Sequence, residues 1–116
     1  MSAQNEAERL ARVWIDGWIA GKPDEIPLAS NFTHSSPFGV VEGRENYLEW
    51  VKPLSAKNTI SLKTVKTLGG EGEAVIWFEM TTPKGMVPCC DWVRTEEGEI
   101  VAIQSFYDAT YLRQNQ

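Results

Sequence analysis

The feature that most constrains the fold is a change of periodicity near residue 59. From there onward, apolar and polar residues alternate in four short stretches, at residues 59–68, 73–82, 86–95 and 99–110. Period-two alternation is typical of β-strands that present one face to a core. The turns LGGEG, PKG and EEG separate the stretches, and short glycine-containing turns favour hairpins. The second half is therefore predicted to be an antiparallel meander, with a bulge near Thr64 and Val65, where the alternation shifts phase.

The first half has a helical pattern instead. Residues 4–20 repeat apolar side chains every three or four positions, which predicts one long helix. A short turn or helix is predicted for residues 23–30, and a further helical segment for residues 44–52, ended by Pro53. Helices followed by a run of antiparallel strands indicate an α+β fold. We expect one domain over residues 1–116, with the long helix covering one face of a curved sheet.

Charge and composition argue against several classes of function. The chain has a net charge of -5 and scattered basic residues, which argues against nucleic acid and anionic membranes as partners. No apolar run approaches the roughly 18 residues of a membrane-spanning helix, and no signal peptide is recognised. Cys89 and Cys90 are adjacent and so point to opposite faces of a strand, and no Cys/His spacing is of the metal-binding type. We expect a reduced, cytoplasmic protein that uses no metal and no cofactor.

Asp91 is the anomaly in the strand pattern. It shares a face with Val87, Cys89 and Val93, so alternation places a carboxyl group on an otherwise apolar face. Burial would raise its pKa, and a neutral carboxylic acid can donate a hydrogen bond to a carbonyl oxygen that becomes an enolate. The alternative is that Asp91 lies at a sheet edge or pairs with Arg94 in solvent. Both interpretations are open at this point, and the first makes Asp91 a candidate catalytic acid.

His34, the only histidine, is the second candidate. In an extended segment it shares a face with Ser36, and it would act as a general base if that face lines a pocket. The alternative is a structural histidine whose ring is satisfied by its neighbours. Ser36 has no activating partner within its own stretch, which makes it a weaker candidate for a nucleophile. Trp14, Trp50 and Trp77 are more typical of a core than of a ligand platform.

Two segments carry a family resemblance: SSPFGVVEGREN and CDWVRTEEGEIVAIQSFYD. With the helices before them, they resemble the SnoaL-like and ketosteroid-isomerase-like branch of the nuclear-transport-factor-two superfamily, over residues 7–110. The resemblance implies a cone-shaped α+β barrel, whose helices pack on a strongly curved, mixed but mainly antiparallel sheet around a deep apolar pocket. It also implies a homodimer through the outer face of the sheet. This fold hosts many reactions as well as plain binding domains, so the resemblance alone names no activity.

Residue by residue, the resemblance is uneven. It places Asp91 where ketosteroid isomerases hold a protonated oxyanion-hole aspartate, and Tyr107 where they keep a pocket aromatic. Trp14 stands in the position of their oxyanion tyrosine, and Ser36 in that of their catalytic base aspartate. Ser105 falls where the limonene-epoxide-hydrolase branch has a final-strand aspartate. The absence of a carboxylate at Ser36 argues against genuine ketosteroid isomerase activity.

Two hypotheses of different classes follow. The first is a cofactor-independent acid–base enzyme, of isomerase, cyclase or lyase type, that acts on a hydrophobic carbonyl compound such as a polyketide-like or steroid-like ligand. Asp91 would be its acid and His34 its base. Its binding residues would be Trp14, Ser36, Phe38, Phe78, Cys89, Ile103, Ser105 and Tyr107. The second is a non-catalytic small-ligand-binding or dimerisation module, whose outer-face aromatics pack a homodimer. Those aromatics are Trp77, Trp92 and Phe106. A partner-binding transport adaptor is a third hypothesis, which only the fold supports.

Overall fold

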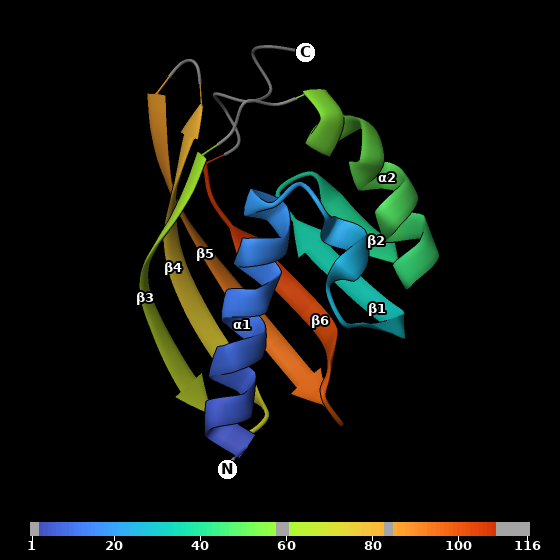
Figure 1. Cartoon of the computed structure of the whole chain (residues 1–116), viewed down its shortest axis with the longest axis vertical. Helices are drawn as coiled ribbons and strands as arrows, with labels where there is room; N and C mark the ends of the chain where they lie inside the picture. Colours follow the sequence, from blue (N-terminus) through green and yellow to red (C-terminus); the bar gives the residue numbers. More distant parts are fainter. Residues whose placement is uncertain (1–2, 58–60, 83–84, 109–116) are drawn as a thin grey trace.

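The computed structural model describes residues 3–57, 61–82 and 85–108 (Figure 1). In chain order the elements are α1 (Ala3–Ile19), the 3-10 helix η1 (Pro23–Glu25), β1 (Leu28–Ser36), β2 (Gly39–Glu42), α2 (Arg44–Lys57), β3 (Ser61–Gly70), β4 (Glu73–Thr82), β5 (Gly85–Glu96) and β6 (Glu99–Phe106). Among the described helices, none is long and apolar enough to cross a membrane.

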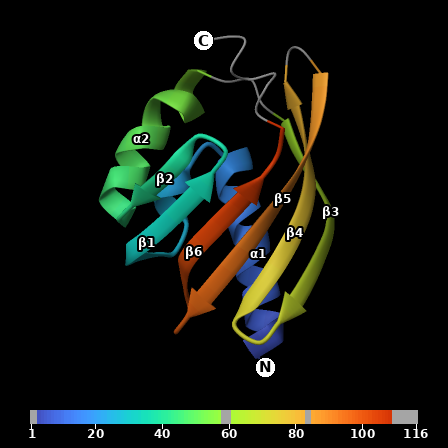
Figure 2. The ribbon, with the colours of Figure 1, turned by 180° about the vertical axis from the view of Figure 1, so that it is seen from behind.

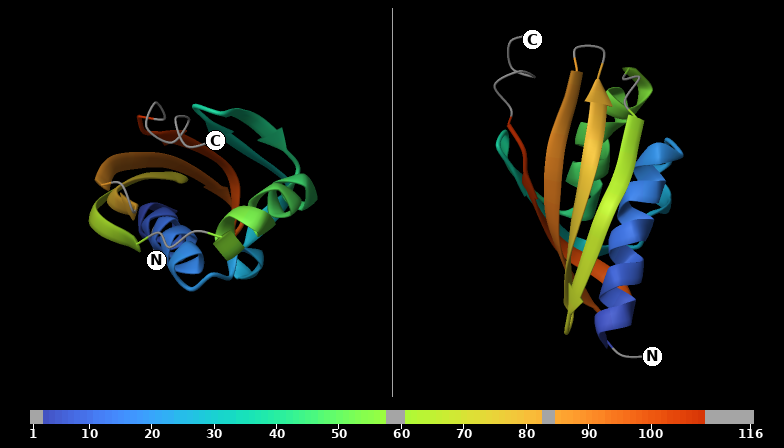
Figure 3. Two further views of the ribbon diagram at one scale, coloured as in Figure 1. Left: turned by 90° about the horizontal axis from the view of Figure 1, so that it is seen from above. Right: turned by 90° about the vertical axis from the view of Figure 1, so that its left-hand side faces the viewer.

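The six strands form one sheet, in the order β2-β1-β6-β5-β4-β3. Neighbouring strands are antiparallel except β1 and β6, which run parallel, so the sheet is mixed and mainly antiparallel, as the resemblance implies. The sheet curls around the helices, as the view from above shows (Figure 3). α1 lies against β3, β4 and β5, and α2 lies against β1 and β2. Figure 2 shows the opposite, outer face of the sheet, which neither of these helices covers. The α+β class is therefore confirmed.

The four strands predicted for the second half are confirmed as the meander β3 to β6. The predicted bulge is present as well, because the pairing of β3 with β4 shifts register between Thr64 and Lys66. Gly72 and Gly98 take φ angles of 73° and 81° in two of the turns, a conformation that suits glycine best. Residues 59–60 and 109–110, which the prediction included, lie outside the described residues.

The segment after α1 is the first correction to the sequence prediction. Only Pro23–Glu25 is helical there, and the strand β1 begins at Leu28, within the stretch predicted to be a turn or helix. Pro27 has no N–H to continue a helix. Its carbonyl oxygen instead accepts a hydrogen bond of 2.9 Å from the N–H of Ile100, which draws the segment onto β6.

The end of α2 is the second correction. The helix does not stop at Pro53 but continues to Lys57. A proline inside a helix costs about 3 kcal/mol, because it removes one hydrogen bond and crowds the preceding turn. Tyr47 and Val51 lie one turn apart on the same helix and are both buried. Burying two such side chains stabilises the turns before Pro53 by about 3–6 kcal/mol.

One core fills the space between the helices and the concave face of the sheet. On α1 the buried residues follow the predicted spacing of three and four: Ala7, Leu10, Ala11, Trp14 and Ile15. On the sheet, alternate residues of β4, β5 and β6 are buried: Ala74, Ile76, Phe78, Val87, Cys89, Val93 and Ile103. Among the described residues, the polar side chains buried with them are His34, Asp91 and Ser105. These three polar groups are therefore part of the core.

Gly17 is a point of close approach between α1 and Ile26. A Cβ at Gly17 would lie 2.4 Å from Cγ1 of Ile26 and 2.7 Å from its Cδ1, and Ile26 is buried. Replacing glycine by alanine inside a helix gains up to about 1 kcal/mol in propensity, whereas overpacking a core costs about 1–3 kcal/mol. We therefore expect Gly17→Ala to lower the free energy of unfolding by about 1 kcal/mol, as measured by urea titration.

Asp16→Ala, on the exposed side of the same helix, is the matched control. It should change the free energy of unfolding by less than about 0.5 kcal/mol. A Gly17→Ala protein more stable than the wild type would contradict the close contact with Ile26.

Candidate active site

Asp91 lies on the concave face of β5, between buried apolar residues of the same strand, and is only 3% exposed. Its carboxyl oxygen Oδ2 accepts a hydrogen bond of 2.8 Å from Nε1 of Trp14, whose indole ring comes from α1. The alternative in which Asp91 lies at a sheet edge or pairs with Arg94 is wrong. Arg94 is exposed on the other face of β5, where its guanidinium lies 5.3 Å from the ring centroid of Trp92.

Ser105 and His34 complete a polar cluster beside this carboxyl group. Ser105 is the direct partner of Asp91 in the β5–β6 pair, and the parallel β1–β6 pair places His34 opposite Ile103. Nε2 of His34 and Oγ of Ser105 are 2.9 Å apart, within hydrogen-bonding distance. The fold therefore brings together four residues predicted from the sequence, one each from α1, β1, β5 and β6.

Among the described residues, none is a hydrogen-bond partner of the second carboxyl oxygen of Asp91. Oδ1 is buried, and nothing in the described part of the chain bonds to it. Burial raises the pKa of Asp91 from its ordinary 3.8 to about 6, and the Ser105 hydroxyl and the Trp14 indole offset part of that rise. Although the Ser105 hydroxyl affects this pKa, its short contact is with His34. A buried polar atom without a partner costs about 1–3 kcal/mol, so a ligand atom that bonded to Oδ1 would bind favourably.

Aromatic rings surround the polar cluster. The centroid of the His34 ring lies 5.9 Å from that of Trp14, 5.1 Å from that of Tyr47 and 6.5 Å from that of Phe32. Burial disfavours the charged imidazolium and lowers the pKa of His34 to about 4. Burial therefore shifts His34 and Asp91 in opposite directions, so that the ring is neutral at pH 7 while the carboxyl group titrates near pH 6.

Tyr47 and Phe32 are parts of this cluster that the sequence reasoning did not assign to the site. Both are fully buried, and burial raises the pKa of Tyr47 well above its ordinary 10.0. The signal that could have found Phe32 is its spacing of two from His34, which places both side chains on one face of a strand. Reading residues 28–36 as a strand would have revealed it.

Three predicted wall residues are buried on successive strands: Phe78 on β4, Cys89 on β5 and Ile103 on β6. Phe78 and Cys89 are register partners. Burial raises the pKa of Cys89 to about 12, so the thiol is protonated and contributes an apolar surface. These three side chains flank the polar cluster, and their part in binding stays a prediction.

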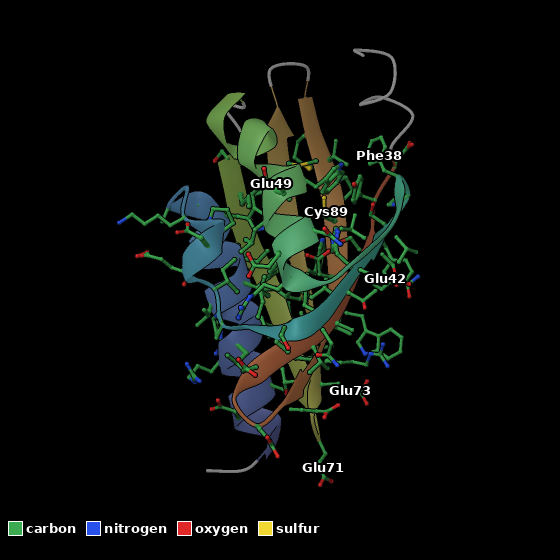
Figure 4. All side chains as sticks on the ribbon, turned by 90° about the vertical axis from the view of Figure 1, so that its right-hand side faces the viewer. Phe38, Glu42, Glu49, Glu71, Glu73 and Cys89 are labelled. Atoms are coloured by element: carbon green, nitrogen blue, oxygen red, sulfur yellow. The ribbon has the colours of Figure 1, made fainter. Side chains whose placement is uncertain are left out.

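The remaining predicted residues lie near the β1–β2 turn. Oγ of Ser36 accepts a hydrogen bond of 3.1 Å from the backbone N–H of Phe38, so this hydroxyl shapes the turn. Phe38 is exposed, and its ring centroid lies 6.2 Å from that of the half-buried Tyr107. In Figure 4, Phe38 and Cys89 lie toward one end of the sheet and Glu71 toward the opposite end. Ser36 and Phe38 therefore bond to each other within the turn, and their part in ligand binding stays a prediction.

Two small hollows are lined by described residues, and neither includes Asp91. One of about 60 Å³ lies between the β1–β2 turn and α2, lined by Ser36, Phe38, Gly39, Val40, Val41 and Trp50. The other, of about 40 Å³, lies on the outer face beside Trp92 and Arg94. The deep apolar pocket is not among them and stays a prediction. Within the described residues, no three His, Cys, Asp or Glu side chains are grouped to hold a metal ion.

Comparison with known proteins gives one sequence match. The profile of the SnoaL-like domain matches residues 11–103, which is most of the chain. Among curated proteins, no sequence matches.

Solved structures share the fold at low sequence identity. A protein of Kribbella flavida DSM 17836, provisionally named a ketosteroid isomerase, has a TM-score of 0.80 and 17% identity, over 93% of this chain and 82% of its own. A protein of Jannaschia sp. CCS1, provisionally named a SnoaL-like polyketide cyclase, has a TM-score of 0.82 and 11% identity, over 98% and 93%. A de novo designed protein with a curved β-sheet has a TM-score of 0.81 and 17% identity, over 99% and 96%. These similarities show the fold alone, since fold does not determine function.

The opposite pKa shifts of His34 and Asp91 predict two opposing effects of pH on the free energy of unfolding, which offset each other in the wild type. Above pH 4 and below pH 6.5, the unfolded chain binds a proton at His34 that the folded protein does not, so stability rises with pH. Above pH 3.8 and below pH 6, the folded protein binds a proton at Asp91 that the unfolded chain does not, so stability falls with pH. Relative to the wild type, Asp91→Asn should therefore gain about 2 kcal/mol of stability between pH 4 and pH 6.

Chemical denaturation at several pH values measures this difference. Asp16→Asn makes the same chemical change on an exposed residue and should follow the wild-type profile. A constant difference between Asp91→Asn and the wild type across this range would show that burial does not raise the pKa of Asp91.

Proposed function

The chain belongs to the SnoaL-like domain family, and we propose that it is a cofactor-independent acid–base enzyme. The proposed reaction is of isomerase, cyclase or lyase type, on a hydrophobic carbonyl compound. The observation that carries the proposal is the buried, unpartnered Oδ1 of Asp91. A carboxyl group whose pKa lies near neutrality and whose oxygen lacks a partner is suited to exchange a proton with a bound ligand.

The bonding of Asp91 supports the role of acid. The indole N–H of Trp14 can only donate, so Oδ2 accepts in both charge states of the carboxyl group. The carbonyl oxygen of a neutral acid is a better acceptor than its hydroxyl oxygen, so the bond from Trp14 favours the proton on Oδ1. From there it can be donated to a carbonyl oxygen of the ligand and stabilise the negative charge that develops on it.

The surroundings of Asp91 support an uncharged ligand head group. The buried polar side chains of the described chain are His34, Asp91 and Ser105, and none of them is a cation at pH 7. A carboxylate on the ligand would face ionised Asp91 without a compensating positive charge. The buried Phe78 and Ile103 on either side suit a hydrocarbon skeleton.

His34 is proposed as the base. Its pKa is about 4, so above that pH the ring is neutral and can accept a proton. Asp91 keeps its own proton below about pH 6. Both groups are in the required form only between these two values. The pH profile of kcat/KM should therefore be bell-shaped, with a maximum at about pH 5.

Exchange of the α-protons of α-tetralone, a hydrophobic ketone, in deuterium oxide tests the proposal without knowledge of the product. We expect the wild type to accelerate this exchange, as measured by NMR, with a maximum rate at about pH 5. Asp91→Asn should slow the catalysed exchange by about 10²–10⁴-fold, because the proton donor is lost.

Asp16→Asn is the control for the exchange experiment and should retain the wild-type rate. Equal rates for Asp91→Asn and the wild type would exclude Asp91 as the acid. A rate that increased with pH through pH 6 would assign Asp91 the role of base instead.

The outer face of the sheet favours a second candidate function, a non-catalytic small-ligand-binding or dimerisation module. The strand register pairs Trp77 with Cys90 and Cys90 with Phe106, so one row of side chains crosses β4, β5 and β6. Trp77 is 47% exposed and Phe106 is 50% exposed. Exposed aromatic side chains are enriched where subunits meet. We infer that two copies of the chain associate through this row.

Sedimentation velocity over a concentration series tests the association. The wild type should sediment as a dimer, and Trp77→Lys should shift it to monomer by placing a charge in the contact. Ile19→Lys, at a 55% exposed apolar residue on the end of α1, is the matched control and should remain dimeric. A monomeric wild type, or a dimeric Trp77→Lys protein, would exclude this interface.

A further inference from the structure

We propose that Ser105 is a positioning residue that directs one chain of hydrogen bonds, from Nε2–H of His34 through the Ser105 hydroxyl to Oδ2 of Asp91, so that Oδ1 is left for the ligand. In this chain Nε2 is the donor, so Nδ1 is the ring nitrogen left to accept a proton. The inference rests on the proposed function for its catalytic meaning. The direction of the chain, however, is a property of the ligand-free protein and can be tested without a substrate.

The sheet topology places Ser105 on the strand between those of His34 and Asp91. β6 lies between β1 and β5, and Ser105 of β6 lies between His34 of β1 and Asp91 of β5. Ser105 is the register partner of Asp91, and its Oγ lies 2.9 Å from Nε2 of His34. All three residues are buried, so water does not compete for these contacts. Trp14 donates to Asp91 as well.

The number of protons available decides the direction of the chain. Ser105 has one hydroxyl proton, and a neutral imidazole has one N–H. If the hydroxyl donated to His34, its oxygen lone pairs would be left to face the carboxylate. If His34 donates to Oγ, the hydroxyl proton is free to face Asp91. A carboxylate is a stronger acceptor than a neutral imidazole, so the second direction is favoured.

The effect of Ser105 on the pKa of Asp91 agrees with this direction of hydrogen bonding. The Ser105 hydroxyl lowers the pKa of Asp91, against the larger effect of burial. A hydrogen bond lowers the pKa of a carboxyl group when it stabilises the ionised form, which a donated proton does. The contact with His34 and the effect on Asp91 are therefore compatible in one orientation of the hydroxyl.

This order of residues excludes a nucleophilic role for Ser105. In a hydrolase triad the histidine lies between the serine and the carboxylate and takes the serine proton. Here the serine lies between the histidine and the carboxylate. The ring nitrogen that faces Ser105 already bears a proton and cannot accept another. Ser105 acts on the reaction only through the groups on either side of it.

NMR of ligand-free protein carrying ¹⁵N-labelled histidine tests the direction directly. His34 is the only histidine, so an untagged protein gives a single imidazole spin system. We expect the Nε2–H tautomer at pH 7.5, where Asp91 is ionised. An Nδ1–H tautomer, with Nε2 as acceptor, would overturn the proposal.

Titration of Asp91 by ¹³C NMR is the second measurement. In Ser105→Ala the pKa of Asp91 should rise above the wild-type value, because a donor to the carboxylate is lost. Ser105→Thr keeps the hydroxyl and should restore the wild-type pKa. Ser35→Ala removes a hydroxyl from the neighbour of His34 on the opposite face of β1 and should leave it unchanged. An unchanged pKa in Ser105→Ala, or equal shifts in Ser105→Ala and Ser35→Ala, would overturn the proposal.

The pH profile of α-tetralone exchange separates this inference from the proposed function. In Ser105→Ala the alkaline limb of the profile should move to higher pH, together with the pKa of Asp91, which a purely structural role would not produce. If the wild type catalyses no exchange while the tautomer and the Asp91 titration are as expected, the proposed function fails and the hydrogen-bond chain stands. If exchange depends on Asp91 but Nε2 of His34 is an acceptor, the proposed hydrogen-bond chain is wrong and the proposed function stands.

Discussion

The hydrogen bond from the indole of Trp14 to the buried carboxyl group of Asp91 is the contact on which the arrangement of the interior depends. A carboxyl group can be buried among rings only if donors meet it there, so α1 must dock at the depth where Trp14 reaches β5. The register of β5 is constrained in the same way. A slip by one residue would turn Asp91 outward and place Cys90 and Trp92 against α1.

The parallel pairing of β1 with β6 is the second determinant of the site. It joins a strand from the first third of the chain to the last described strand, and it carries His34 to within hydrogen-bonding distance of Ser105. Without β1, the meander from β3 to β6 would hold a buried carboxyl group and a serine but no imidazole. A designed protein has the same curved sheet, so the chemistry depends on which polar groups a sequence places on it.

Much of the fold follows from local patterns in the sequence. Alternation and turn glycines predict the meander and its bulge, because each strand presents one face to the core and one to solvent. The same alternation assigns Asp91 and Ser105 to the concave face. The position of β1 could not be predicted in this way, since Pro27 precedes it and its first residues look like part of a turn or helix until Ile100 is present to bond to Pro27. The continuation of α2 through Pro53 was missed because a proline inside a helical pattern usually marks the end of the helix.

The contacts that build the site join residues far apart in the sequence: Trp14 to Asp91 across 77 positions, and His34 to Ser105 across 71. Closing such long loops is slow relative to forming helices and hairpins, so these contacts are established only once the whole sheet is assembled. During synthesis, α1 and β1 leave the ribosome well before β5 and β6 exist. The apolar faces of α1 and β1 therefore stay uncovered until β5 and β6 are made. The hydrogen bonds around Asp91 are among the last contacts to form.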